Sequence, residues 1–391
     1  MLKSKKELND KMSINIRTIR VYVYRAPIDT PVITSFGVMI DRPAVIVRLE
    51  DDDGGVGWGE VWCNFPSCGA EHRAKLIETV LAPLLFNTTF EHPADAYDSL
   101  SKQTHILGIQ TGEIGPIAQS IAGVDIALWD LFARKNNMPL FQLLGGANPE
   151  IPVYASGINP NTAAETISRA REEGFKAFKI KIGFGHKDDL KTVTNAIATL
   201  VVSEKLMADA NQAWNVDEAI EFIQLLDGIP LAWLEEPIPA DRPDDEWYKV
   251  AAASDVPIAA GENIRGASDF SLKVESGVLG IVQPDICKWG GISANLSVAR
   301  EIIASQARYC PHYLGGGIGL IASAHLLSAA GGDGLLEVDV NTNPLREGLA
   351  APFPKISDGK ISLSSDPGLG IVPVISDLEK ICVYRVHLSN P

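Results

Sequence analysis

Cysteine is scarce in this chain and follows no recognisable pattern. The 391 residues include only Cys63, Cys68, Cys287, Cys310 and Cys382, and no two of them form a CxxC pair. This density and spacing exclude a disulfide scaffold and a cysteine-based zinc site. They favour a reducing compartment, so we expect a cytoplasmic protein.

Long apolar runs and an excess of positive charge are also missing. No run approaches the roughly 20 apolar residues of a membrane span, and the basic start MLKSKKELNDKMS lacks the apolar centre of a signal peptide. The net charge is −15, whereas nucleic-acid binding needs clustered Lys and Arg. These deficits argue against a membrane or nucleic-acid partner.

What is present is enough apolar material for large cores, because 46% of the residues are hydrophobic. The segment INIRTIRVYVYR from Ile14 predicts an edge strand, and AVIVRLEDDDGGVGWGEVW predicts two strands around an Asp-Gly-Gly turn. Helical patterns follow residue 70, and from residue 151 strands and helices alternate. We therefore expect a disordered extension (1–13), an α+β domain (14–146), a barrel catalytic domain (147–344) and a C-terminal segment returning to the first domain (345–391).

Polar residues recur at the ends of the apolar runs in the barrel region, at intervals of 23 to 28 residues. This interval matches one strand plus one crossover helix, and we count eight such strands. A parallel barrel gathers the carboxyl ends of its strands around one mouth, where enzymes of this architecture have their active sites. The residues are Lys181, Asp209, Glu235, Glu262, Asp285, His312 and Glu337.

Two lysines share one face of the second barrel strand, since Lys179 and Lys181 are two residues apart. Burial and mutual repulsion disfavour the ammonium form, so we predict a lowered pKa that makes a lysine a base near neutral pH. The alternative is a strand end at which both side chains reach solvent.

Three successive strands end in carboxylates, at Asp209, Glu235 and Glu262. Side by side they would repel one another unless a cation lies between them. Ligands that are all oxygen favour a hard divalent ion, so we predict Mg²⁺, with Asn211 supporting Asp209 from the same face. A single strand-end acid is more often a helix cap, but three in consecutive strands make capping a poor explanation.

Asp285 and His312 end the sixth and seventh strands. Neighbouring strands lie about 4.8 Å apart, so the carboxylate can accept a hydrogen bond from the imidazole and raise its basicity. The alternative is a core histidine with a satisfied bond. Glu337 is predicted to be a protonated carboxylic acid that donates a hydrogen bond to a developing oxyanion.

These motifs together resemble the mandelate racemase subgroup of the enolase superfamily. The order is K-x-K (179–181), D-x-N (209–211), E-E-P (235–237), G-E-N (261–263), P-D with K-x-G-G (284–291), then His312 and Glu337. The segments GVDIALWDLFARKNNMPLFQLLGG and SDPGLGI also look like signatures of that family. The resemblance covers the chain from Ile14 onward and implies an α/β fold: a modified TIM barrel, (β/α)7β, with an N-terminal α+β capping domain.

The resemblance also implies a mechanism. A small carboxylate substrate chelates Mg²⁺, and Lys181 or the His312/Asp285 pair removes the proton alpha to the carboxylate. The enediolate is held by the metal, Lys179 and Glu337. Lys288 is catalytic in some relatives, but strand parity predicts that it lies on the other face from Asp285, in a supporting role.

The reaction that follows proton removal is less defined by the sequence. We favour dehydration of a hydroxy acid such as an acid sugar, with racemisation or epimerisation of a small carboxylate as the alternative and a non-catalytic binding barrel as a remote one. The 31–39 segment is predicted to be an apolar lid loop, mobile without substrate. Polar contacts to substrate are expected from Trp62, Asn64, Ser67, Trp214 and Arg346, and a homo-oligomer is expected.

Overall fold

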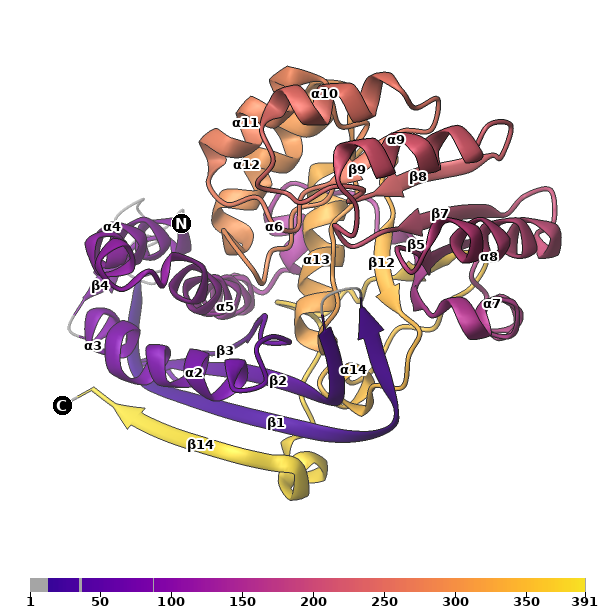
Figure 1. The fold of residues 1–391 in the computed structure, drawn as a ribbon. Coiled ribbons are helices and arrows are strands. Elements are labelled where there is room, and N and C mark those ends of the chain that lie inside the picture. Colours follow the sequence, from indigo (N-terminus) through magenta and orange to yellow (C-terminus); the bar gives the residue numbers. More distant parts are fainter. Residues whose placement is uncertain (1–12, 35–36, 87, 391) are drawn as a thin grey trace.

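The computed structural model describes residues 13–34, 37–86 and 88–390, in which two sheets are each covered by helices (Figure 1). The first part of the chain forms a sheet with helices on one side, in the lower half of Figure 1. Its elements are β1 (Ile14–Thr34), β2 (Gly37–Asp51), β3 (Val56–Val61), α2 (Gly69–Leu76), a π-helical turn (Ile77–Leu81), α3 (Ala82–Leu85), β4 (Thr89–Phe90), α4 (Pro93–Thr111), α5 (Ile114–Lys135) and α6 (Leu140–Leu143).

The second part alternates eight strands with seven helices. Its strands are β5 (Glu150–Ile158), β6 (Ala177–Lys181), β7 (Lys205–Asp209), β8 (Leu231–Glu235), β9 (Ile258–Ala260), β10 (Ile281–Val282), β11 (Arg308–Tyr309) and β12 (Leu336–Asp339). Its helices are α7 (Ala163–Glu172), α8 (His186–Thr199), α9 (Val216–Leu225), α10 (Asp244–Ala252), α11 (Ala267–Ser276), α12 (Gly291–Ala304) and α13 (Gly317–Ala330), and a 3₁₀ turn (Pro160–Thr162) precedes α7.

The strands of this second part pair in parallel in the order β11-β10-β9-β8-β7-β6-β5-β12. Seven βα units followed by a final strand are the (β/α)7β pattern, so the predicted fold class is confirmed. Among the described residues no ladder joins β11 to β12. The ring of backbone hydrogen bonds around the barrel is therefore interrupted between β11 and β12.

The C-terminal segment contributes to both sheets. It contains α14 (Pro344–Gly348), β13 (Lys360–Ser362), a 3₁₀ helix (Ile375–Ile381) and β14 (Cys382–Ser389). β13 pairs with β5, and β14 runs antiparallel to β1 along the outside of the first sheet (Figure 1). The sheet order is β14-β1-β2-β3, so the prediction of an edge strand at Ile14 is wrong: β14 covers that edge.

The predicted turn between the second and third strands is confirmed. β2 and β3 pair antiparallel, and the turn is closed by a hydrogen bond from the Gly54 amide to the Asp51 carbonyl (3.0 Å). Gly54 has a φ of +79°, a conformation that favours glycine. This turn points β3 back toward the barrel.

An apolar layer fills the inside of the barrel beneath the polar residues. It combines Tyr154, Ala177, Met207, Trp233, Ala259, Ile281 and Cys310. Ala177, Met207 and Trp233 precede the polar residues of their strands by two or four positions, so the polar side chains lie above them on the same inward face. Because side chains on one face of a strand recur every two residues, the polar groups lie at the mouth of the barrel, above the apolar layer.

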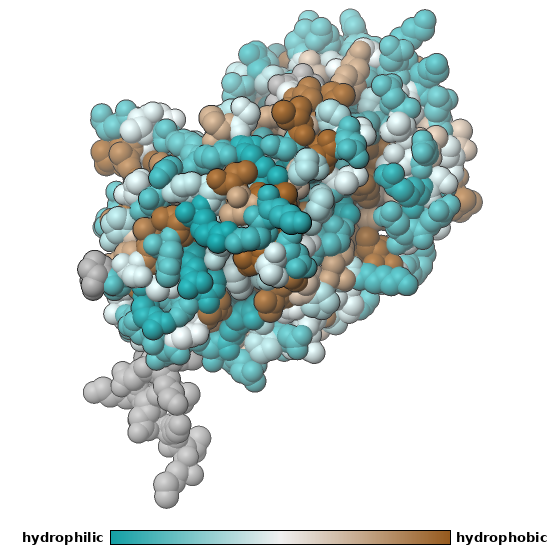
Figure 2. Space-filling model, turned by 90° about the horizontal axis from the view of Figure 1, so that it is seen from below, coloured by the Kyte–Doolittle hydropathy of each residue, from teal (hydrophilic) through white to brown (hydrophobic). Residues whose placement is uncertain are grey.

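No helix among the described residues has the length and apolarity needed to cross a bilayer. Seen from below the view of Figure 1, the surface is mainly hydrophilic, with apolar residues in separate groups (Figure 2).

Candidate active site

Lys181, Asp209 and Glu235 are the last residues of β6, β7 and β8, as predicted, and they lie level with one another in the ladder. β9, β10 and β11 are shorter. Glu262, Asp285 and His312 therefore lie two or three residues beyond these strands, in the loops that follow. The mouth is thus built half from strand ends and half from loops.

Both lysines are buried and each is paired with a carboxylate. Lys179 Nζ lies 2.6 Å from Glu235 Oε1 and 2.7 Å from Glu337 Oε1, and Lys181 Nζ lies 2.6 Å from Asp209 Oδ2. Burial lowers the pKa of each lysine, but the neighbouring carboxylates raise it more, and both pKa values end above the usual one. The predicted lowering of the lysine pKa is therefore wrong for this arrangement.

The carboxylates outnumber the cationic groups at the mouth. The acids are Asp209, Glu235, Glu236, Glu262, Asp285 and Glu337, and the cationic groups are Lys179, Lys181, Lys288 and, when protonated, His312. Burial raises the pKa of Glu235 to about 7; Lys179 opposes this rise, and the Asp209 and Glu337 carboxylates add to it. A divalent cation would relieve this excess, so the donor chemistry of the site fits Mg²⁺.

The carboxylates are nevertheless turned toward protein cations. In the part of the chain that the structure describes, no three acidic, His or Cys side chains surround one point closely enough to hold a metal. The reason is that Lys181, Lys179 and His312 hold Asp209, Glu235 and Glu262 respectively. Metal ligation requires these side chains to turn, so the predicted ligand set stays a prediction.

Two residues that we did not predict hold Glu235 by hydrogen bonds. Trp233 Nε1 donates to Glu235 Oε2 (3.1 Å), and Gln283 Nε2 donates to the same oxygen (2.7 Å). Trp233 precedes Glu235 by two residues, so strand periodicity contained this signal. The prediction for Asn211 fits its position, because its amide and its side chain both donate to Asp209 (2.8 and 3.2 Å).

His312 and Asp285 form the predicted pair, with Nδ1 lying 2.8 Å from Oδ2. The amides of Cys287 and Lys288 donate to the other Asp285 oxygen. His312 Nε2 lies 2.5 Å from Glu262 Oε2. Burial lowers the pKa of His312, but the Glu262 and Glu337 carboxylates raise it well above its usual value.

The surroundings of Glu337 lower its pKa, which contradicts the prediction of a protonated acid. It lies within β12, is buried, and accepts hydrogen bonds from Ser156 Oγ and the Tyr313 amide. Burial raises its pKa, but Lys179 and His312 lower it more, to about 2. A carboxylate beside two cations cannot keep a proton.

Lys288 lies at the mouth, so the parity argument that placed it on the other face is wrong. Its Nζ lies 2.9 Å from Asn263 Oδ1 and 3.7 Å from Glu262 Oε1. β10 ends at Val282, and residues 286–290 form a turn, to which strand parity does not apply. Asn263 also donates to Glu236 (2.9 Å), a buried acid whose pKa burial raises to about 8.

The residues predicted to contact substrate are mostly engaged elsewhere. The Trp62 ring lies over Lys288 Nζ at 4.7 Å and so borders the site. Asn64 donates to the Leu314 carbonyl, the Ser67 carbonyl accepts from Arg25, and Trp214 packs on Phe222. Arg346 donates to Glu347 and to the Asp339 carbonyl.

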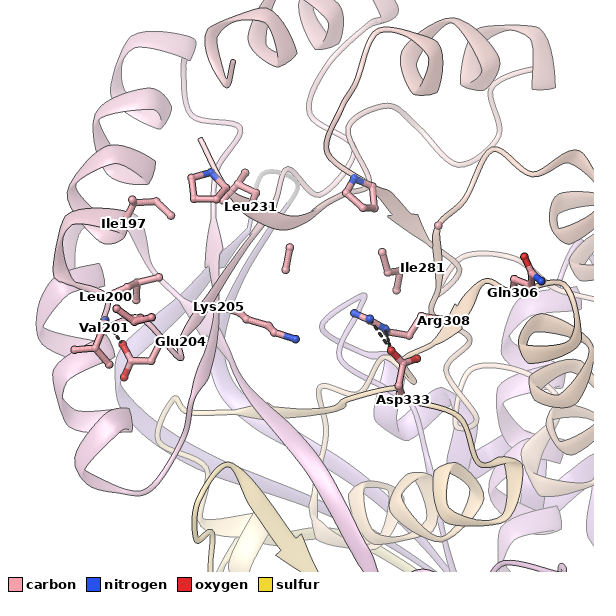
Figure 3. Close-up of a pocket in the computed structure, with 15 residues that line it drawn as sticks. Ile197, Leu200, Val201, Glu204, Lys205, Leu231, Ile281, Gln306, Arg308 and Asp333 are labelled. Carbon is pink, nitrogen blue, oxygen red and sulfur yellow. Dashed lines mark hydrogen bonds and ion pairs between the residues drawn. The ribbon is translucent and has the colours of Figure 1, made fainter. Parts of the chain in front are cut away.

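A cavity of about 790 Å³ lies at the opposite end of the barrel, around the strand starts (Figure 3). It is bordered by apolar side chains such as Leu231 and Ile281, by Lys205, and by the ion pair of Arg308 with Asp333 (2.7 Å). None of the predicted site residues lines it. Because the acid and base groups gather at the carboxyl ends of the strands, that end is the candidate active site.

The comparisons with known proteins agree with this arrangement. Residues 16–145 match the family model described as mandelate racemase/muconate lactonizing enzyme, N-terminal domain, and residues 162–376 match the model described as enolase C-terminal domain-like. The chain therefore belongs to the mandelate racemase/muconate lactonizing enzyme family of the enolase superfamily, and it is an enzyme.

Individual relatives span nearly the whole chain. A D-galactarolactone cycloisomerase of Agrobacterium fabrum is 30% identical over 378 residues, covering 92% of this chain and 96% of the relative. Further curated relatives are named as a dehydratase and as a racemase.

Solved structures of the same family resemble this fold closely. The structure of a mandelate racemase/muconate lactonizing enzyme from Bordetella bronchiseptica RB50 is 49% identical with a TM-score of 0.90, covering 95% of this chain and all of that one. A racemase from Streptomyces coelicolor A3(2) with bound magnesium is 28% identical with a TM-score of 0.85, covering 94% of this chain and all of that one.

Proposed function

We propose that this enzyme removes the proton alpha to the carboxylate of a small hydroxy acid, such as an acid sugar, and that the enediolate then loses a beta-hydroxyl group. The observation that carries the proposal is the pairing of an acid/base dyad, His312 with Asp285 at 2.8 Å, with a lysine on another part of the same mouth. The cycloisomerase relative, whose name specifies a sugar-acid lactone, supports a sugar acid as substrate.

The two base candidates approach from different sides. Lys181 ends β6 and His312 follows β11, so they are separated by β7 to β10 in one direction and by β5 and β12 in the other. A substrate between them presents opposite faces of its alpha carbon to the two groups. In dehydration one group removes the alpha proton, and His312, with its charge held by Asp285, gives a proton to the departing hydroxyl.

The remaining polar groups bind the substrate and orient the two base candidates. Lys179 lies between Glu235 and Glu337 and supplies positive charge beside the position of the enediolate oxygens. Asp209 holds Lys181 as an ammonium ion, so a change of partner by Asp209 would lower the pKa of Lys181 toward that of a base.

Magnesium is the cofactor that we propose, held by Asp209, Glu235 and Glu262. When bound, it polarises the substrate carboxylate and stabilises the charge that develops there. The excess of carboxylates at the mouth supports it, as does the magnesium present in the related racemase structure.

A panel of acid sugars and chiral carboxylates tests the proposal, with product mass and deuterium uptake from solvent measured together. We expect a product lighter by one water for a sugar acid. The Lys181→Ala/His312→Asn double variant should lose turnover entirely; wild-type turnover in that variant would contradict the proposal.

Racemisation or epimerisation is the second candidate, favoured by the two bases on opposite faces. In that case each single variant, Lys181→Ala or His312→Asn, should stop racemisation while still exchanging the alpha proton of one enantiomer. A dehydratase should instead lose product formation in His312→Asn. Mass and exchange data therefore separate the two reactions.

A cytoplasmic location and a homo-oligomeric assembly belong to the same proposal. The five cysteines are all free, which supports a reducing compartment. Ile106, Leu107, Ile109 and Ile114 are exposed around the turn from α4 to α5, an apolar group that supports contact between copies. Light scattering of the purified protein measures the assembly.

A further inference from the structure

Glu60, near the end of β3, reaches from the first domain into the barrel. Its carboxylate is buried and accepts hydrogen bonds from the amides of Gly316 (2.5 Å) and Gly319 (2.9 Å). These amides belong to the start of α13, which has no side-chain cap of its own at Gly316. Glu60 accepts from two amides that have no partner within the helix, so it serves as the cap of α13 from another domain.

The glycine-rich segment at this helix start is shaped around Glu60 and Tyr313. A Cβ atom on Gly316 would lie 2.7 Å from Glu60 Oε1, and one on Gly315 would lie 2.5 Å from Tyr313 Oη. On Gly319 a Cβ would lie 2.4 Å from Tyr313 Oη. Side chains at these positions would push the carboxylate or the ring away, so the sequence LGGGIG suits this contact.

The segment held in this way follows His312 directly. β11 ends at Tyr309, so no ladder bond fixes His312 itself. The segment is held instead by four hydrogen bonds. The Tyr313 amide donates to Glu337 (2.9 Å), the Leu314 carbonyl accepts from Asn64 (2.5 Å), the Gly315 carbonyl accepts from Asn343 (2.8 Å), and the Gly316 amide donates to Glu60. Two of these four contacts come from the first domain.

Lys181 is placed differently. It is the last residue of β6 and lies in register with Asp209 of the neighbouring strand. Its position comes from the barrel ladder and its ion pair with Asp209, and no contact with the first domain is needed. The two base candidates therefore depend on different parts of the molecule.

We propose that Glu60 is a positioning residue for His312, which it acts on through the glycine-rich segment 313–319. The inference rests on the proposed function, in which His312 exchanges a proton with the substrate. Loss of the Glu60 carboxylate, which accepts hydrogen bonds from the Gly316 and Gly319 amides, would loosen the start of α13 and misplace the imidazole relative to the alpha carbon, whereas Lys181 would stay in place.

The test measures deuterium exchange at the alpha carbon (C2) in the Glu60→Gln variant. The substrate is the acid of the panel that exchanges fastest with wild type, and both of its C2 epimers are measured. Exchange that disappears in the His312→Asn variant is assigned to His312. Exchange that disappears in the Lys181→Ala variant is assigned to Lys181. We expect Glu60→Gln to slow the His312-dependent exchange roughly tenfold to 100-fold, since small misplacements cost that much, with the Lys181-dependent exchange changed by less than about twofold. The turnover number should fall with little change in KM.

Asp130→Asn is the matched control. Asp130 is also a buried carboxylate of the first domain that accepts amide hydrogen bonds across the molecule, from Trp58 (2.9 Å) and Leu369 (2.7 Å), but it does not touch residues 313–319. This variant should change both exchanges alike. Equal loss of both exchanges in Glu60→Gln would overturn the inference, because that is the result of a general structural role.

A second variant covers the case in which Glu60→Gln folds poorly. In Glu60→Ala, added formate can occupy the space beside the Gly316 and Gly319 amides, and we expect it to restore the His312-dependent exchange selectively. Formate without effect on a folded Glu60→Ala protein would count against the inference. Absence in wild type of both alpha-proton exchange and water loss with every acid of the panel would instead reject the proposed function.

Discussion

At the scale of single residues, the barrel mouth contains few uncommitted groups. Each cation contacts a carboxylate, and the acids are separated by their pKa values: about 2 for Glu337, about 7 for Glu235 and about 8 for Glu236. Lys179 and His312 lie beside Glu337, whereas Glu236 is buried among other acids, and this accounts for the difference. For a reaction to occur at this mouth, the lysines, His312 and the carboxylates must change their hydrogen-bond and ion-pair partners as the substrate binds.

His325 has no part in that mouth, and it allows a test of stability against pH. It is buried in α13; Nδ1 accepts from the Phe141 amide (3.0 Å), and Nε2 lies 3.2 Å from the Leu369 carbonyl. Burial lowers its pKa from 6.5 to about 4. The folded-state pKa lies below the unfolded one, so the stabilisation is complete above pH 6.5 and is lost as the pH falls toward 4.

We predict that His325→Gln removes this dependence. Wild type should lose about 2–3 kcal/mol of unfolding free energy between pH 7 and 4.5 through this group, whereas a glutamine takes up no proton. Urea denaturation of both proteins at the two pH values measures the difference. A gap between the two proteins that stays constant with pH would show that His325 does not titrate in this way.

At the scale of elements, the predicted lid proves to be a β-hairpin. The segment 31–39 was expected to be a loop, but Val32 pairs with Met39 and Ile33 with Val38, and residues 35–36 lie outside the described part. Ile33, Val38 and Ile40 are exposed, and Ile33 borders a cavity of about 900 Å³ that Phe184 also lines. Val32 and Met39 are buried, so the hairpin is packed on one face and leaves apolar side chains exposed on the other, next to the cavity.

We therefore predict that residues 30–34 and 37–40 gain hydrogen-exchange protection when a substrate acid is added. The reason is that the exposed apolar side chains can be buried only if the hairpin closes. Exchange followed by mass spectrometry with and without ligand measures it, with the buried stretch of β2 at residues 44–47 as the internal reference. Equal protection with and without ligand would contradict a lid.

The sequence predicted which strands are present better than it predicted where each strand ends. The eight barrel strands and the ends of β6, β7 and β8 were predicted correctly because each apolar run stops at its polar residue. The short β9, β10 and β11 were not, since ladder pairing and not hydrophobicity ends them. The same shortness invalidated the parity argument for Lys288.

Contacts between residues far apart in the chain could not be predicted from the sequence. Glu60 meets Gly316 across 256 residues, and no local pattern links the two. β14 carried a signal, because Cys382, Tyr384, Val386 and Leu388 alternate toward the core, but that pattern does not show which strand it pairs with. The pKa of Glu337 also depended on partners that only the fold brings together.

At the scale of the whole molecule, the excess of carboxylates at the mouth predicts dependence on a divalent metal. Exhaustive chelation should abolish turnover, and added Mg²⁺ should restore it. Asp209→Asn should weaken magnesium binding, measured by calorimetry, and should also abolish turnover, because a proposed ligand of the metal is lost. Full activity after chelation would contradict the metal assignment, and unchanged calorimetry in the variant would exclude Asp209 as a ligand.

The pairing of β14 with β1 has a consequence for how the protein is made. Thr18 to Tyr24 belongs to the first described strand to leave the ribosome, and its partner, Cys382 to Ser389, is the last of the described strands to do so. At the usual speed of translation the growing chain waits roughly 20 to 70 s before that strand can be covered. During that interval β1 presents an unpaired edge of the kind that recruits other chains. A nascent chain that stalls before residue 382 can complete the barrel strands but not this sheet, so β14 decides whether the first sheet is protected from aggregation.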